Sequence, residues 1–252
     1  YNALTANTTG IENIAIGRDS MDACVSGDYN IGIGSNALGA MADVASDFNI
    51  AIGYDALGSA NHADLDGCIA IGRSALYDMN GTGGAGTVAI GYQSCENLTT
   101  GGGNVAVGQQ TLSTETDANY CTAIGHQALQ QQANDSTASV FNTAVGFQAG
   151  RLGTTHINSV YVGYLAGGEA TITGQSNVII GSEAGKSWTS ANENVAIGFH
   201  SQRLHLTGDY NTTLGAKTMQ DTNAHSNMQD SSHNTFLGWN SGGGTWTGTA
   251  AC

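Results

Sequence analysis

The chain has 252 residues, of which 37 are glycine, five are cysteine and none is proline. Six Lys and Arg against 20 Asp and Glu give a formal net charge of −14, which repels nucleic-acid phosphates and anionic membrane surfaces. We therefore expect no nucleic-acid partner and no membrane insertion. A glycine-rich backbone without proline indicates strand ladders joined by turns.

From the first residues onward, a short apolar strand that ends in glycine recurs along the chain. Its first copy is Asn13-Ile14-Ala15-Ile16-Gly17, and the closing glycine then recurs every 17 to 23 residues. The thirteen closing glycines are Gly17, Gly34, Gly53, Gly72, Gly91, Gly108, Gly125, Gly146, Gly163, Gly181, Gly198, Gly215 and Gly238. A near-constant step of this size is typical of stacked structural repeats.

The repeat predicts an all-β fold, a β-solenoid or parallel β-roll of about 13 coils of 17–23 residues. Residues 1–252 form one continuous array in this prediction, because no shift in composition marks a domain boundary. Tyr1-Asn2-Ala3-Leu4 matches the residues that follow Gly53, so we expect a fragment or processed product that starts inside a repeat. Residues 239–252, with two tryptophans and a glycine run, are expected to form a terminal cap or a junction.

Each strand carries two aliphatic residues around a small one, as in Ile50-Ala51-Ile52. Strand period two puts the aliphatic pair on one face, which we expect to be the interior of the coil. The small residue points the other way, so a second backbone is expected to approach it closely. In four copies threonine replaces the first aliphatic residue: Thr122, Thr143, Thr212 and Thr235.

The fourth residue after the glycine is often a second apolar anchor, as in Leu38 and Leu57. In four copies this anchor is a glycine: Gly150, Gly167, Gly185 and Gly242. In three of these copies the central strand residue is large: Tyr161, Ile179 and Phe236. This paired change predicts that the two positions share one compartment, in which volume lost at one is regained at the other.

An asparagine opens the strand in nine copies, and the polar loops between copies vary in length. These asparagines are Asn13, Asn30, Asn49, Asn104, Asn142, Asn177, Asn194, Asn211 and Asn234. Stacked coils would bring them into a ladder of hydrogen bonds along the array.

One coil buries too few side chains to offset the entropy of ordering its backbone, so stacking and a further interface are needed. We expect an obligate homo-oligomer that uses the row of small strand residues as this interface. Three chains around an axis are the simplest closed arrangement for a fibre.

The sequence predicts no enzymatic activity, because its acidic residues lie mainly in the variable loops, one or two per repeat. The histidines include no His-x-His and the cysteines no Cys-x-x-Cys. For so acidic a chain we expect no cofactor beyond loosely bound calcium, which the charge favours over a transition metal. The cysteines are expected to be isolated thiols in small buried sites.

An aromatic residue follows the closing glycine in six copies: Tyr54, Tyr92, Phe147, Tyr164, Phe199 and Trp239. Two arrangements remain open for them. They form a stripe on which sugar rings stack, or they pack as corner side chains on their stacked neighbours.

The block Asn30-Ile31-Gly32-Ile33-Gly34-Ser35-Asn36-Ala37-Leu38 resembles repeats of two groups of trimeric fibrous proteins. One group is the heads of trimeric autotransporter adhesins, and the other is the repeat region of trimeric bacteriophage tail fibres. The resemblance implies a homotrimer of parallel β-rolls, left-handed in the adhesin heads. The longer and less uniform repeats of this chain favour the tail fibre.

The expected function is therefore that of a structural segment of an attachment apparatus, most simply a phage tail fibre or receptor-binding fibre, located on a virion surface or otherwise extracellular. Its expected partners are copies of itself, a host cell-surface glycan or protein receptor, and other virion or fibre proteins. The alternatives are a bacterial trimeric adhesin head and a subunit of a head-to-tail extracellular filament. A tailspike-like polysaccharide depolymerase is the least favoured alternative.

Overall fold

The computed structural model describes residues 1–41, 46–61, 65–81, 83–132, 140–220 and 231–243. All regular secondary structure in these residues is β-strand. The chain divides into two compact units. Among the described residues, unit 1 holds Tyr1–His126, and unit 2 holds Gln127–Gln132 and the described part of Val140–Cys252.

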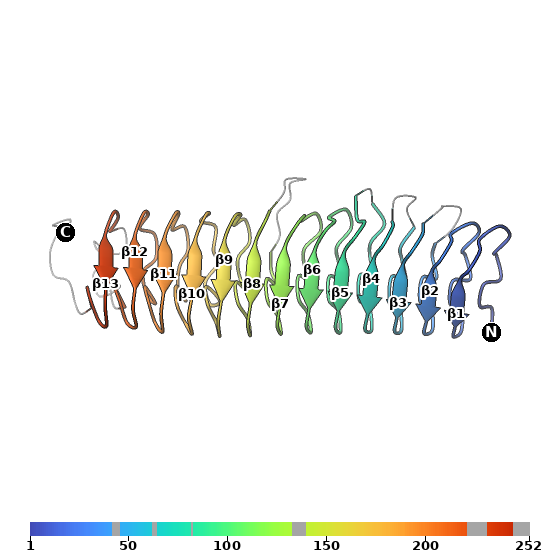
Figure 1. Ribbon diagram of the computed structural model, residues 1–252, viewed down its shortest axis with the longest axis horizontal. Coiled ribbons are helices and arrows are strands. Elements are labelled where there is room, and N and C mark those ends of the chain that lie inside the picture. The colour runs from blue at the N-terminus through green and yellow to red at the C-terminus, as the bar shows by residue number, and fades with distance from the viewer. Residues whose placement is uncertain (42–45, 62–64, 82, 133–139, 221–230, 244–252) are drawn as a thin grey trace. The chain divides into compact units, whose positions relative to one another are not determined.

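Each unit contains one parallel sheet of three-residue strands, which follow one another in chain order (Figure 1). Unit 1 contains β1 (Ile14–Ile16), β2 (Ile31–Ile33), β3 (Ile50–Ile52), β4 (Ile69–Ile71), β5 (Val88–Ile90), β6 (Val105–Val107) and β7 (Thr122–Ile124). Unit 2 contains β8 (Thr143–Val145), β9 (Val160–Val162), β10 (Val178–Ile180), β11 (Val195–Ile197), β12 (Thr212–Leu214) and β13 (Thr235–Leu237). Equivalent residues lie opposite one another, as Ala51 does to Ala70.

This arrangement confirms the predicted all-β β-solenoid of parallel strands. One continuous array over residues 1–252 stays a prediction, and so does the cap or junction at 239–252. Of this last segment, residues 244–252 lie outside the described part of the chain.

The closing glycines hold a backbone conformation that other residues reach only with strain. Gly17 has a φ of 134° and Gly53 a φ of 140°, in the positive region that a Cβ disfavours. A Cβ on Gly17 would also collide with the carbonyl oxygen of Gly34, the equivalent residue of the next coil. Both the backbone conformation and the close stacking of coils therefore require glycine.

The turn after the glycine also uses left-handed backbone at residues that are not glycine. Asn36 and Leu38, the second and fourth residues after Gly34, have φ values of 58° and 53°. Such a conformation costs on the order of 1 kcal/mol or more for a residue with a Cβ. Hydrogen bonds between coils offset this cost, because the Leu38 N–H donates to the carbonyl oxygen of Ala56 at 3.0 Å.

The strand residues face opposite to the direction that the sequence predicts. The central alanines Ala51 and Ala70 are fully buried, whereas the flanking aliphatic residues are half-buried or exposed. Ile14 and Ile16 at the ends of β1 are 48% and 59% exposed. The prediction that the aliphatic pair fills the coil interior is therefore wrong. The small residue points inward, and the pair points outward.

In most coils the interior accepts only a small residue from the strand, because the turn supplies the large one. Leu38, Leu57 and Leu76, which follow the glycines by four residues, are fully buried. A Cβ on Gly32 would lie 2.8 Å from Cγ of Met21, an anchor of the same kind. The predicted interface through the row of small residues is therefore also wrong, since the same chain already covers these residues.

Volume compensation between the strand and the anchor is confirmed. Tyr161 is fully buried, and a Cβ on Gly167 would lie 2.6 Å from its ring. A Cβ on Gly242 would lie 2.8 Å from the Phe236 ring. Large strand residues thus occupy the space that a leucine or methionine fills in other coils.

The asparagines that open the strands connect successive coils. The Asn49 backbone N–H donates to Oδ1 of Asn30 at 2.9 Å, and the Asn30 amide donates to the carbonyl oxygen of Ser46 at 2.8 Å. Unit 2 repeats the pattern, since the Asn211 N–H donates to Oδ1 of Asn194 at 2.7 Å. Where cysteine replaces the next asparagine, as at Cys68, its N–H still donates to the preceding side chain. Each asparagine therefore satisfies buried backbone groups of its neighbouring coil.

Candidate interaction surfaces

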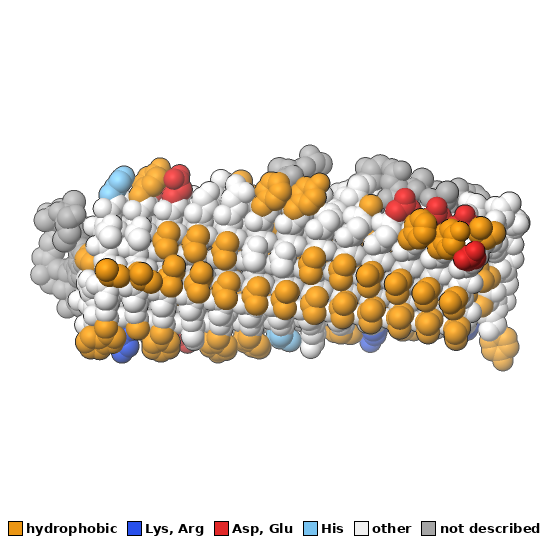
Figure 2. Space-filling view, viewed as in Figure 1, with side chains coloured by type: hydrophobic (Ala, Val, Ile, Leu, Met, Phe, Trp, Pro, Cys, Tyr) orange, Lys and Arg blue, Asp and Glu red, His pale blue; other side chains and the backbone are white. Residues whose placement is uncertain are grey.

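The first and third residues of the strands form an outward-facing apolar row in each unit, which we name the outer aliphatic face. Figure 2 shows hydrophobic side chains in rows over the strands. In unit 1, each of the strands β1 to β7 contributes two residues to this face. Thr122 is the only polar one among them. At about 4.8 Å per strand, the row of these seven strands extends over about 34 Å. Contiguous exposed apolar patches are uncommon on monomeric proteins.

The four threonines at the first position of their strands, Thr122, Thr143, Thr212 and Thr235, also lie on the outer aliphatic face. Thr143 is half-buried, and Thr212 and Thr235 are exposed. A hydroxyl group in the coil interior would need a hydrogen-bond partner, whereas on the outer face water can supply one. Their position therefore agrees with the outward direction of the aliphatic pair.

The six aromatic residues after the closing glycines lie at the coil corners, where several pack on neighbouring side chains. The Arg73 guanidinium lies between two rings, 5.8 Å from the centroid of Tyr54 and 5.7 Å from that of Tyr92. Phe147 stacks on Tyr164 at 5.5 Å, and Phe199 stacks on His200 at 3.7 Å between centroids. Trp239 is 74% exposed. Packing on neighbours is thus present, and glycan stacking on this row stays a prediction.

A second aromatic row, which the sequence analysis missed, occupies the position two residues before each strand. We name it the pre-strand row. Tyr29 and Phe48 stack with centroids 5.0 Å apart and planes 1° apart, and Tyr210 stacks on His233 at 4.9 Å. In the sequence this row is hard to recognise, because glycine and polar residues occupy the same position in other coils. The feature that Tyr29 and Phe48 share is a positive φ, 58° and 60° respectively.

Acidic side chains run beside the pre-strand row in unit 1. The Asp28 N–H donates to Oδ1 of Asp47, and the Asp47 N–H donates to Oδ1 of Asp66, both at 2.8 Å. Figure 2 shows acidic and hydrophobic side chains close together above the strands β1 to β3, at one edge of the molecular face that it displays. These carboxylates bridge successive coils.

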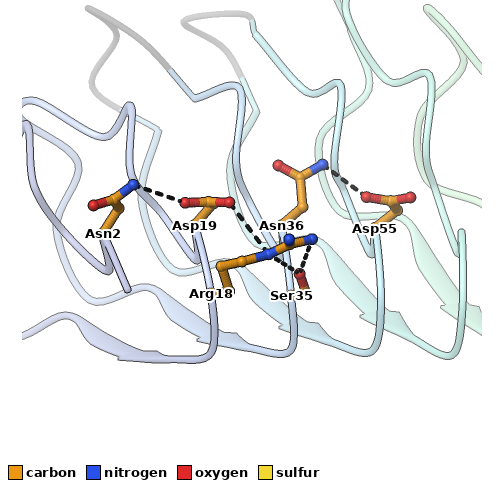
Figure 3. A network of polar contacts seen from close by, with 6 residues as sticks. All are labelled: Asn2, Arg18, Asp19, Ser35, Asn36 and Asp55. Carbon is orange, nitrogen blue, oxygen red and sulfur yellow. Dashed lines mark hydrogen bonds and ion pairs between the residues drawn. The ribbon is translucent and has the colours of Figure 1, made fainter.

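Polar side chains form a further network at the coil corners of unit 1 (Figure 3). The amide of Asn2 donates to Asp19 at 3.1 Å, and the amide of Asn36 donates to Asp55 at 2.7 Å. Arg18 forms an ion pair with Asp19 at 3.5 Å. Because amides and carboxylates alternate along this row, like charges do not lie on adjacent coils.

Unit 2 carries an ion cluster around Glu183. Its carboxylate lies 2.7 Å from Nε of Arg203, 3.3 Å from Nζ of Lys186 and 3.3 Å from Nε2 of His200. Burial raises the pKa of Glu183, but the hydrogen bonds from Arg203 and Lys186 outweigh this effect and hold the pKa below its ordinary value. The cluster joins successive coils and is partly exposed, so we expect a modest contribution to stability.

The interior holds a few polar groups that do not reach the surfaces. The Tyr161 hydroxyl and Nδ1 of His156 are 3.0 Å apart, and burial lowers the pKa of His156 to about 4, which keeps the imidazole neutral near pH 7. Cys24, Cys68, Cys95 and Cys121 are buried free thiols, as predicted, whereas Cys252 lies outside the described residues. Burial raises the pKa of Cys68 to about 11. Such thiols react slowly.

In the part of the chain that the structure describes, no three His, Cys, Asp or Glu side chains lie together in a way that could hold a metal ion. Over the same residues, no helix is long and apolar enough to cross a membrane. No protein-family model, curated protein or solved structure matches this chain.

Proposed function

We propose that this chain is a structural segment of an extracellular attachment fibre, and that copies of it assemble through their outer aliphatic faces. The observation that supports the proposal is the outward row of isoleucine, valine and leucine on both units. Such a row is unfavourable in water, because apolar area stays hydrated. Surfaces of this kind commonly contact another protein.

The assembly that we propose is a homotrimer. Three copies of one face around an axis form a closed arrangement in which every chain covers its apolar row. The interface then consists of the aliphatic pairs, not of the small strand residues that the sequence suggested. Stacked coils held by hydrogen bonds suit a rigid spacer, as a phage tail fibre or receptor-binding fibre on a virion surface requires.

This role requires neither catalysis nor a cofactor. A host cell-surface glycan or protein is the proposed receptor, and other virion or fibre proteins are the proposed partners at the ends of the fibre.

The mass of the purified chain in solution tests the assembly. We expect about 77 kDa by light scattering at neutral pH, which is three times the 25.6 kDa of one chain. The double variant Ile90→Lys and Val107→Lys places charges on the outer aliphatic face of β5 and β6 and should lower the mass to that of a monomer. Gln109→Lys is the control for an added lysine away from this face, because it places a positive charge at an exposed corner of the β6 coil.

A wild-type chain that stays monomeric would overturn the proposed assembly. A trimer that tolerates both lysines with an unchanged far-ultraviolet circular dichroism spectrum would show that another surface joins the chains. Open-ended polymers in negative-stain images would instead support the head-to-tail filament.

A further inference from the structure

The pre-strand row of unit 1 is interrupted after its second aromatic residue. Tyr29 and Phe48 precede β2 and β3, and glycine takes the same position before β4, β5 and β6. These glycines are Gly67, Gly86 and Gly103. Tyr120 then resumes the row before β7. The backbone is the same throughout, since φ lies at 60° in Phe48, 67° in Gly67 and 60° in Tyr120.

Because of this interruption, one face of the Phe48 ring turns toward Gly67 and not toward another aromatic ring of the row. The 5.0 Å between the Tyr29 and Phe48 centroids matches the step between strands, so the rings stack in the direction in which the coils follow one another. One face of Phe48 therefore contacts Tyr29, and the other turns toward the coil of β4. Phe48 is 60% exposed.

The next two coils leave the positions where side chains of the row would start uncovered. Apart from the two adjacent residues of the chain, no atom of the described residues comes within 4 Å of a Cβ built on Gly67 or on Gly86. At Gly103 the situation differs, because the Tyr120 ring lies 2.9 Å from such a Cβ. The open stretch thus covers the positions of Gly67 and Gly86, and three coil steps, roughly 14 Å, separate Phe48 from Gly103.

Carboxylates lie directly beside this stretch. Asp47 precedes Phe48, and Asp66 precedes Gly67. Asp66 is exposed, and its Oδ1 accepts the Asp47 N–H at 2.8 Å. A carboxylate offers about four acceptor sites, so Asp66 can accept further hydrogen bonds.

We propose that Phe48, Asp66 and the open backbone at Gly67 and Gly86 bind a neutral saccharide. A pyranose ring stacks on Phe48 where an aromatic side chain of the next coil would otherwise lie, and its hydroxyls donate to Asp66 and Asp47. The site is separate from the row after the closing glycines, in which Arg73 packs against Tyr54 and Tyr92.

The chemistry of the stretch favours a neutral sugar over other ring-shaped ligands. An apolar protein side chain would stack on Phe48 equally well, but it would cover the carboxylates without donating hydrogen bonds to them. Asp28, Asp47 and Asp66, within a chain of net charge −14, repel an acidic sugar. A saccharide supplies both an apolar face and several hydroxyl donors. The inference rests on the proposed attachment function and names the class of receptor for it.

Isothermal titration of the full chain with cellotriose, maltotriose and tri-N-acetylchitotriose tests the site, with trigalacturonate as the anionic comparison. We expect at least one neutral trisaccharide to bind, and trigalacturonate to bind more weakly. Phe48→Ala should weaken binding about three- to tenfold through the lost ring contact. Gly67→Tyr should abolish binding, because its ring takes the place of the sugar. Tyr29 and Tyr120 show that tyrosine fits this backbone conformation.

Tyr210→Ala is the matched control, since it removes a ring of the same row that stacks on His233 in unit 2. It should leave saccharide binding unchanged. The inference is overturned if no neutral trisaccharide binds, or if Phe48→Ala and Gly67→Tyr bind as the wild type does while keeping its mass and circular dichroism spectrum. Binding of N-acetyltryptophanamide in place of the sugars would assign the site to a protein partner and would also overturn it. A trimer without saccharide binding refutes this inference alone, whereas a monomer that binds saccharide refutes the proposed assembly alone.

Discussion

Glycine serves two different purposes in this chain, and the surroundings of each residue distinguish them. Gly53 closes β3 with a φ of 140°, and a Cβ there would lie 2.5 Å from the carbonyl oxygen of Gly72. Gly67 has a φ of 67°, and apart from the two adjacent residues no described atom lies within 4 Å of its Cβ position. Close packing and backbone conformation both demand glycine at the first position, but only backbone conformation favours it at the second.

Alanine substitutions should separate these two effects. Gly53→Ala adds strain and overlap, so we expect it to lower the free energy of unfolding by at least about 2 kcal/mol. Gly67→Ala adds only the backbone cost, about 1 kcal/mol. Urea unfolding followed by circular dichroism measures both variants. Equal midpoints for the two would contradict the role of coil stacking at the closing glycines.

At the scale of the element, most coils are filled by one large side chain, which comes from the strand or from the turn. Tyr161 of β9 occupies the space beside Gly167 of its own coil, where a Cβ would lie 2.6 Å from the tyrosine ring. In other coils the same space holds a leucine such as Leu57, which has a φ of 48°, close to the 57° of Gly167. The two solutions should therefore be exchangeable.

A double-mutant cycle tests this exchange. Tyr161→Ala should cost about 3–5 kcal/mol by leaving a cavity, and Gly167→Leu alone should cost about 1–3 kcal/mol by overlap with the ring. Together they recreate the alanine and leucine pair of other coils, so the double variant should regain much of the lost stability. The coupling energy follows from urea unfolding of the four proteins. Additive costs would show that the two positions do not share a compartment.

The sequence was sufficient to predict the strands, their parallel stacking and the positions of the turns, because the glycine period has a direct physical cause. It did not predict which way the strands face. Alternation in Ile50-Ala51-Ile52 shows that the isoleucines share a side, but only the fully buried Leu57 across the coil decides that alanine is on the inside. The pre-strand row was missed because its common feature is a positive φ, which residues as different as Tyr29 and Gly67 share.

At the scale of the whole molecule, the outer aliphatic face and the net charge act in opposite directions. Apolar area on both units favours association, whereas each added chain brings a formal charge of −14. A trimer would carry −42, three times the charge of one chain. Because only six Lys and Arg are present, cross-chain ion pairs can neutralise little of it.

Association should therefore strengthen as salt screens the repulsion between chains. Raising NaCl from about 20 mM to about 500 mM shortens the Debye length from roughly 20 Å to a few ångströms, and we expect the association constant to rise about tenfold. Sedimentation equilibrium at both salt concentrations measures this change. Weaker association at high salt would indicate that attraction between charges, and not burial of the outer aliphatic face, joins the chains. The Gln109→Lys variant sharpens the comparison, because its added positive charge should strengthen association at low salt and matter little at high salt.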